Sequence, residues 1–124
     1  MFPACPVRNI LARLCDKWAL LVLYLLARSQ TGKLRFTELR QAMPDISQKM
    51  LATTLRTLEE DGYITRTLYA EVPPRVEYAL TARSETLRPI LEELLVWAVD
   101  NMDAVMQDRR ESHGSKDKIK RMEE

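Results

Sequence analysis

Hydrophobic residues recur along most of this chain with the spacing of amphipathic helices. Apolar positions three and four apart predict a first helix over residues 6–15. A second helix, capped by Asp16, is apolar nearly all round and ends before Gly32, so we expect it to form the centre of the core. A short third helix is predicted to open at Thr37 and to end at Pro44.

The segment over residues 47–61 predicts a fourth helix with two contrasting faces. Its three leucines share one apolar stripe at a helical period, and its polar residues point the opposite way. Ser47 is placed to act as the N-cap, and Gly62 suits the left-handed residue just past the end. Because a turn of about four residues joins it to the third helix, the pair predicts a helix-turn-helix arrangement.

Two runs rich in β-branched and aromatic residues, "YITRTLYA" and "PRVEYALT", flank "EVPP" and predict a β-hairpin. A register that places the apolar side chains on one face pairs Ile64 with Leu80 and Leu68 with Val76. Arg66 then falls on the same face. Either its charged end reaches solvent along its apolar stem, or the register is different.

A last long helix is predicted to follow Thr81, which can cap it. Pro89 lies inside its apolar pattern, where proline is expected to kink the helix or to mark a break. From Arg109 onward charged residues alternate with few apolar ones, which is typical of a disordered tail. We therefore expect one domain over residues 1–108 and a tail over residues 109–124.

The order of elements, with a helix-turn-helix followed by a hairpin and another helix, is that of a winged helix. The predicted fold class is mainly α with a small β-hairpin, flanked by N- and C-terminal helices. The 124 residues suit one domain, and 46% apolar with 30% charged residues is ordinary globular composition. The net charge of +1 means that any surface for a nucleic acid must be a local patch.

Several other classes are disfavoured by the composition. The apolar run over residues 18–27 is far shorter than the roughly 20 residues that a bilayer requires. The first residues lack the features of a secretion signal, so we expect a cytoplasmic protein with reduced cysteines and no membrane partner. His113 is the only histidine, and we expect no metal site and no cofactor.

Several motifs together resemble the HxlR-type transcriptional regulators, which are related to the MarR regulators. They are "CPV" at Cys5, "KWALLVLYLL" at Lys17, "LRFTEL" at Leu34, "ISQKMLATTLRTLEEDGYITR", "VPPRVEYALT" and "LRPILEELLVW". The resemblance covers about residues 5–97 and is specific because the motifs occur jointly. The chain departs from the family at Cys15 and Asp16, where a glycine pair is common, and at Ser84, where a glycine is common. These positions lie at helix ends, so the departures affect local geometry.

A surface for double-stranded DNA is predicted on the fourth helix and the wing. The N-terminal residues of a recognition helix face base edges in the major groove, and wing cations reach phosphates or the minor groove. The acidic residues 59–61 sit at the other end, where phosphates would repel them. The alternative is an ordinary solvated helix face. The residues assigned to DNA are Ser47, Gln48, Lys49, Thr53, Arg56, Arg66 and Arg75.

The first and last helices carry apolar stripes that one small domain cannot easily cover. We expect them to form a symmetric homodimer, which the resemblance also implies, with two recognition helices about 34 Å apart. A monomer that hides the stripe internally is the alternative. The residues assigned to the dimer are Val7, Ile10, Leu11, Leu14, Leu94, Trp97, Ala98, Met102 and Val105.

Cys5 precedes Pro6 at a helix N-terminus, where the helix dipole stabilises a thiolate. The resemblance implies a redox switch at this position, open to an oxidant or electrophile as effector. Cys15 lies about 15 Å farther along a helix, too far for a bridge within one chain, so any disulfide should join two subunits. The alternative is an ordinary free thiol at Cys5 and a core thiol at Cys15.

The function predicted from the sequence is that of a DNA-binding transcriptional regulator, acting as a repressor that occupies a promoter as a homodimer. A winged-helix module that binds a protein partner and not DNA is the alternative, although no apolar patch marks the recognition face. A thiol enzyme ranks last because no histidine or other base is near Cys5. We therefore expect a regulator and not an enzyme.

Overall fold

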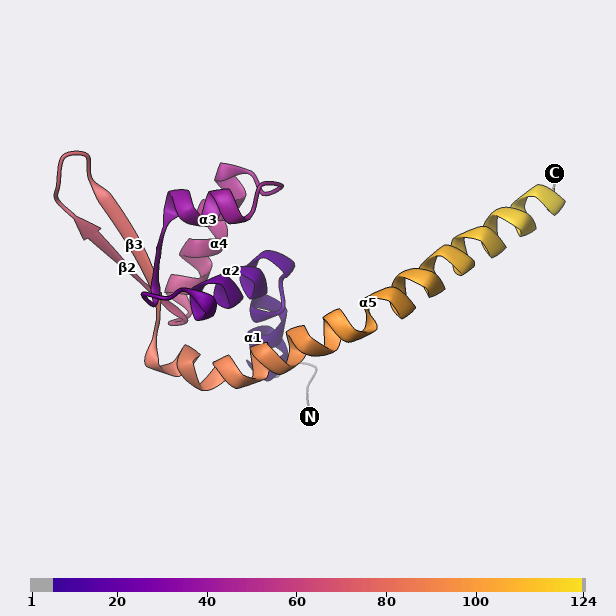
Figure 1. Ribbon diagram of the computed structural model, residues 1–124, viewed down its shortest axis with the longest axis horizontal. Helices are drawn as coiled ribbons and strands as arrows, with labels where there is room; N and C mark the ends of the chain where they lie inside the picture. Colours follow the sequence, from indigo (N-terminus) through magenta and orange to yellow (C-terminus); the bar gives the residue numbers. More distant parts are fainter. Residues whose placement is uncertain (1–5, 124) are drawn as a thin grey trace. The chain divides into compact units, whose positions relative to one another are not determined.

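The computed structural model describes residues 6–123, without the side chains of residues 116–121 and 123. It divides into an N-terminal unit that ends at Leu91 and a second unit that starts at Glu92. The elements, labelled in Figure 1, are α1 (Pro6–Leu14), α2 (Lys17–Arg28), β1 (Lys33–Arg35), α3 (Phe36–Ala42), α4 (Gln48–Glu60), β2 (Ile64–Tyr69), β3 (Arg75–Leu80) and α5 (Ala82–Glu123).

The core of the N-terminal unit is built around α2, as its nearly continuous apolar sequence predicts. Val22, Leu23 and Leu26 are fully buried, and the leucine stripe of α4 packs into the same cluster. Burial of a leucine side chain stabilises a fold by roughly 1.5–3 kcal/mol, so this stripe holds α4 firmly by one face. The other core members are Ala19, Leu39, Met43, Ile46, Leu51, Leu55, Leu58, Ile64, Tyr78 and Leu91.

The predicted helix ends are confirmed at four places. Asp16 accepts hydrogen bonds from the backbone amides of the first turn of α2, and Ser47 accepts one from the Met50 amide at 3.0 Å. Gly62 has a φ of 79°, the left-handed conformation that glycine adopts without strain. Before α5, Thr81 Oγ1 accepts from the amide of Ser84.

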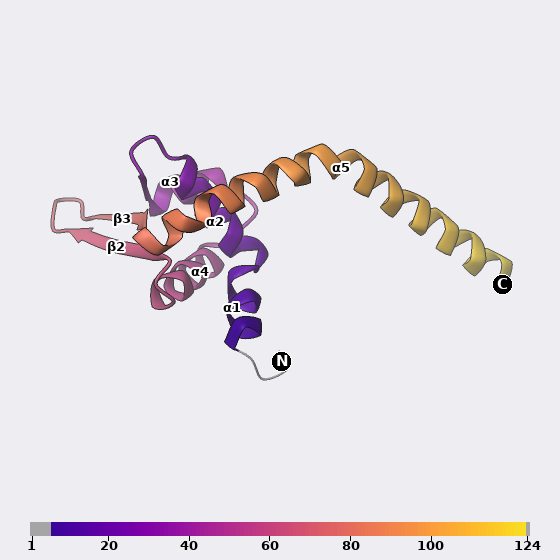
Figure 2. The same cartoon turned by 90° about the horizontal axis from the view of Figure 1, so that it is seen from below.

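The hairpin forms in the predicted register, with Ile64 opposite Leu80 and Leu68 opposite Val76. The strands β2 and β3 project together from the N-terminal unit as a wing (Figures 1 and 2). Arg66 lies on the same face as the apolar residues but is exposed. Of the two interpretations, a solvent-exposed charged end is therefore correct and a different register is not. A third strand, β1, pairs with β3 to give the order β1-β3-β2, and the sequence analysis missed it.

Three local predictions need correction. The third helix begins at Phe36 and not at Thr37, because Glu38 turns back to accept a 2.9 Å hydrogen bond from the Arg35 amide. The first helix ends at Leu14. Cys15, considered as a core thiol, is exposed because it lies in the turn between α1 and α2.

Helix α5 is longer than the sequence predicts. It continues through Pro89, and within the N-terminal unit its first turns are held by burial of Leu91 and by a hydrogen bond from Arg88 to the Ala27 carbonyl. It also remains helical from residue 109 to Glu123, where the sequence predicted a disordered tail. Side-chain hydrogen bonds three and four residues apart, such as Gln107 Nε2 to Glu111 at 3.0 Å, support the helix there. The structure divides into its two units between residues 91 and 92, and the domain over residues 1–108 with a tail over residues 109–124 stays a prediction.

Candidate nucleic-acid interface

The N-terminal half of α4 presents a polar face to solvent. Its apolar stripe is buried against α2, so the residues on the opposite side are turned outward by the same geometry. The Ser47 cap fixes where this face begins. The residues that the sequence assigned to DNA on this helix are all exposed: Ser47, Gln48, Lys49, Thr53 and Arg56.

The members of this polar face differ in what they contact. Gln48 Oε1 accepts a 3.2 Å hydrogen bond from Arg40 Nη1 of α3, and Thr53 Oγ1 donates to the carbonyl of Lys49 at 3.0 Å. Within the described residues, neither Lys49 nor Arg56 forms an ion pair. Their charges are therefore available to an outside partner.

The C-terminal end of α4 carries the opposite charge and is tied to α1. Arg13 Nε donates a 2.7 Å hydrogen bond to Asp61 Oδ2, and the Arg13 guanidinium lies 3.6 Å from Glu60. The hydrogen bond and the charge of Asp61 raise the pKa of Arg13 above its ordinary value. Helix α4 thus has an exposed, cationic N-terminal part and an acidic C-terminal end that is paired with Arg13 of α1.

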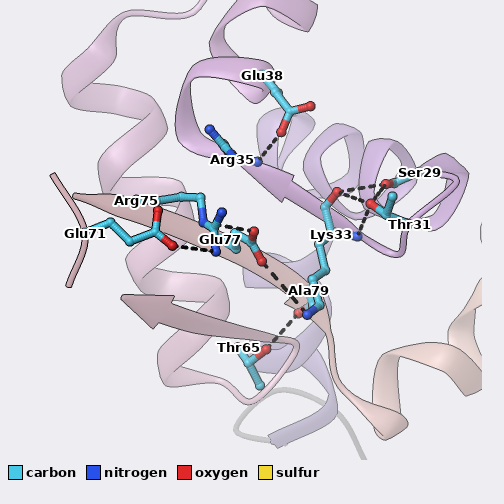
Figure 3. A network of polar contacts seen from close by, with 10 residues as sticks. All are labelled: Ser29, Thr31, Lys33, Arg35, Glu38, Thr65, Glu71, Arg75, Glu77 and Ala79. Atoms are coloured by element: carbon cyan, nitrogen blue, oxygen red, sulfur yellow. Dashed lines mark hydrogen bonds and ion pairs between the residues drawn. The ribbon is translucent and has the colours of Figure 1, made fainter. Parts of the chain in front are cut away.

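The two arginines assigned to the wing lie in different surroundings. Arg66 is exposed on β2 and, among the described residues, makes no ion pair. Arg75 lies 3.2 Å from Glu71 and 3.3 Å from Glu77 (Figure 3). Its guanidinium also sits 4.2 Å from the centre of the Tyr69 ring. Arg75 is therefore largely occupied within the wing, by Glu77 of its own strand and by Glu71 and Tyr69 on the other side of the hairpin tip, which the sequence did not indicate.

A groove of about 650 Å³ lies between β1, α3 and the wing. Lys33 and Arg35 line it and are both exposed, and Lys33 Nζ lies 3.9 Å from Glu77 (Figure 3). The sequence analysis missed these two cations. The signal was the basic triplet "KLR" before the third helix, which became informative only when β1 brought it beside β3.

Exposed apolar side chains occur on α1 and on α5, as predicted, and we describe each helix by itself. On α1, Val7, Ile10 and Leu11 are about half exposed, whereas Leu14 is partly buried against the core. On α5, Trp97 is 60% exposed. The other α5 residues assigned to the dimer, Leu94, Ala98, Met102 and Val105, are exposed too, as are Val96 and Val99, which were not assigned.

The remaining predictions concern thiols, metals and membranes. Cys5 lies outside the described residues, and Cys15 is a free thiol. In residues 6–123, apart from the side chains left out, no group of His, Cys, Asp or Glu gathers as metal ligands. No helix within that part of the chain combines the length and hydropathy of a membrane-spanning segment.

Comparison with known proteins identifies relatives of the same type. The HxlR-like helix-turn-helix family matches residues 13–106. The uncharacterized HTH-type transcriptional regulator BH0655 of Halalkalibacterium halodurans is 43% identical over 98 residues, which cover 79% of this chain and 85% of the relative. The solved structure of the redox regulator HypR in its reduced form is 39% identical, with a TM-score of 0.73 over 83% of this chain and 99% of that chain.

A second redox protein has a similar fold. The reduced form of the transcriptional regulator YodB from B. subtilis is 34% identical, with a TM-score of 0.63 over 76% of this chain and 90% of that chain. The family and these relatives are regulators and not enzymes, so the prediction that this chain is no enzyme is confirmed. The chain therefore belongs to the HxlR-like helix-turn-helix family and is a transcriptional regulator of the helix-turn-helix type.

Proposed function

We propose that this regulator represses transcription by binding a near-palindromic site on double-stranded DNA as a homodimer. The observation that carries the proposal is the outward polar face of α4, with Lys49 and Arg56 exposed and without intramolecular ion pairs. A helix held by one buried face and capped at Ser47 can insert its N-terminal turns into a major groove without refolding. Arg66 adds an exposed cation on the wing, where phosphates or the minor groove would lie.

The dimer in this proposal is supported by the exposed apolar residues of α1 and of α5. Large exposed apolar patches commonly mark protein interfaces, and a twofold axis would present two copies of α4 to successive major grooves. A small shift between the two subunits would then prevent both helices from engaging at once. A signal that shifts the two subunits could therefore control DNA binding. We also propose that the protein is cytoplasmic, where it has direct access to DNA.

Cys5 is our candidate for the redox signal. The similarity to the redox regulator HypR supports a thiol switch, and Cys5 directly precedes in the sequence the residue at which α1 begins, Pro6. An oxidant such as diamide would accept two electrons and two protons from two Cys5 thiols, one of each subunit, as the S–S bond forms. The bond would join the N-termini of the two α1 helices.

The test is DNA binding as a function of salt, with a labelled duplex taken from upstream of the protein's own gene. If Lys49, Arg56 and Arg66 of both subunits contact phosphates, about six ions are released and log K should fall with log salt at a slope near −5. Lys49→Ala and Arg56→Ala should each reduce the steepness by about two, because each variant removes two contacts per dimer. A flat salt dependence would favour the alternative, a winged-helix module that binds a protein.

The redox part is tested with the same duplex after diamide treatment. We expect the wild type to release DNA and to run as a covalent dimer on a non-reducing gel, and Cys5→Ser to do neither. Cys15→Ser is the matched control and should respond as the wild type does, since Cys15 lies beyond α1. An equal response to diamide in wild type and Cys5→Ser would overturn the assignment of Cys5.

A further inference from the structure

The first residue of α4 does not point freely into solvent but is held by the preceding helix. Arg40, in the last turn of α3, donates from Nη1 to Oε1 of Gln48 at 3.2 Å. Arg40 is half-buried and Gln48 is exposed, so the more restrained side chain positions the freer one. Both residues belong to the N-terminal unit, whose helix-turn-helix brings them together.

The contact decides which half of the Gln48 amide faces outward. A glutamine amide has one acceptor oxygen and one nitrogen with two donor hydrogens, whereas a guanidinium can only donate. Arg40 therefore selects the oxygen of Gln48, and the amide nitrogen is left to meet a partner in front of the helix. The exposed end of this pair is a donor.

Guanine and adenine differ in the hydrogen-bonding groups that they present to a donor side chain in the major groove. Adenine offers an acceptor at N7 and a donor at N6, and a glutamine reads it with both its nitrogen and its oxygen. Guanine offers acceptors at N7 and O6 and no donor on that edge. A Gln48 side chain whose oxygen already faces a guanidinium matches guanine and matches adenine poorly.

We propose that Arg40 is a specificity-determining positioning residue, which orients Gln48 so that the protein prefers guanine over adenine at the base that Gln48 contacts. This inference rests on the proposed DNA-binding function. Arg40 retains further N–H groups that can contact a phosphate at the same time, because a guanidinium carries five donors. A phosphate contact alone would change affinity uniformly and would leave the base preference unchanged.

The experiment is in vitro selection from a random-sequence duplex library with the wild type, Gln48→Ala, Arg40→Met, Arg40→Lys and Arg66→Met. The base pair that Gln48 contacts is identified as the position of the selected DNA site at which Gln48→Ala loses its base preference. There we expect the wild type to prefer guanine over adenine by roughly five-fold or more. Arg40→Met should bring the ratio near one or reverse it, and Arg40→Lys should restore guanine because an ammonium also donates.

Arg66→Met is the matched control, since it removes the same charge from the wing without touching Gln48 and should lower affinity but keep the base preference. Circular dichroism of Arg40→Met should show an unchanged helical content. An unaltered guanine preference in Arg40→Met, or adenine as the wild-type choice, would overturn the inference alone. Enrichment of no sequence by the wild type would overturn the proposed function and this inference with it.

Discussion

Arg13 Nε donates a 2.7 Å hydrogen bond to Oδ2 of Asp61, and this contact joins the last turn of α1 to the residue that ends α4. The helix that we assign to the dimer is thereby coupled to the helix that we assign to DNA. A change in the orientation of α1 would be passed to α4 through this pair. The same arginine also pairs the acidic C-terminal end of α4 with α1, at the opposite end of the helix from its cationic residues.

Arg13→Ala should loosen α1 from the rest of the N-terminal unit. We expect faster amide hydrogen exchange over Pro6–Leu14 and unchanged exchange in α2, because no residue of α1 is buried and the variant removes the Arg13–Asp61 contact between α1 and the end of α4. The difference in α1 exchange rate between the variant and the wild type should become smaller in about 1 M salt, where charges are screened beyond roughly 3 Å. Equal exchange rates for α1 in the variant and the wild type would show that the pair does not hold this helix.

Ser47→Ala should lower the free energy of unfolding by about 1 kcal/mol, because the Met50 amide loses its side-chain acceptor at the start of α4. Urea denaturation followed by circular dichroism measures the change. Thr53→Ala is the matched control, since its exposed hydroxyl only donates to the carbonyl of Lys49 within the same helix. If both variants were equally stable, Ser47 would not act as an energetically significant cap.

Glu71→Gln should increase affinity for duplex DNA. The Glu71 carboxylate lies 3.2 Å from Arg75 and adds a negative charge to the wing, so its removal leaves Arg75 paired with Glu77 alone and reduces repulsion of phosphates. Fluorescence anisotropy with a labelled duplex at several salt concentrations should show tighter binding and a steeper salt dependence. Arg75→Met should act in the opposite direction, and weaker binding by Glu71→Gln would contradict a wing that contacts DNA.

Trp97→Glu should convert the proposed dimer into monomers, because a charge would be placed on the exposed apolar stripe of α5. Sedimentation velocity distinguishes the two states. Val96→Glu is the matched control: Val96 is equally exposed but lies 100° around the helix from Trp97, off the assigned stripe. Loss of the dimer in Val96→Glu with a wild-type result for Trp97→Glu would place the interface on another face.

Features that depend on near neighbours in the chain were predictable. The Asp16 and Ser47 caps and the left-handed Gly62 follow from residues within one helical turn, and they were found where predicted. The hairpin register was also found as predicted, since a slip by one residue would turn Ile64 away from the core face. The family resemblance then indicated a regulator, which the comparisons confirm.

By itself, then, the sequence determined the helix-turn-helix, the wing and the polar face of α4, because periodicity and capping act over a few residues. Tertiary structure alone decided the pairing of the third strand β1 with β3, the ion pair of Arg75 with Glu71, and the hydrogen bonds from Arg13 to Asp61 and from Arg40 to Gln48. Each of these joins residues on different elements or across a turn. Which atoms meet there depends on how the packed elements are oriented, and no spacing along the chain specifies that orientation.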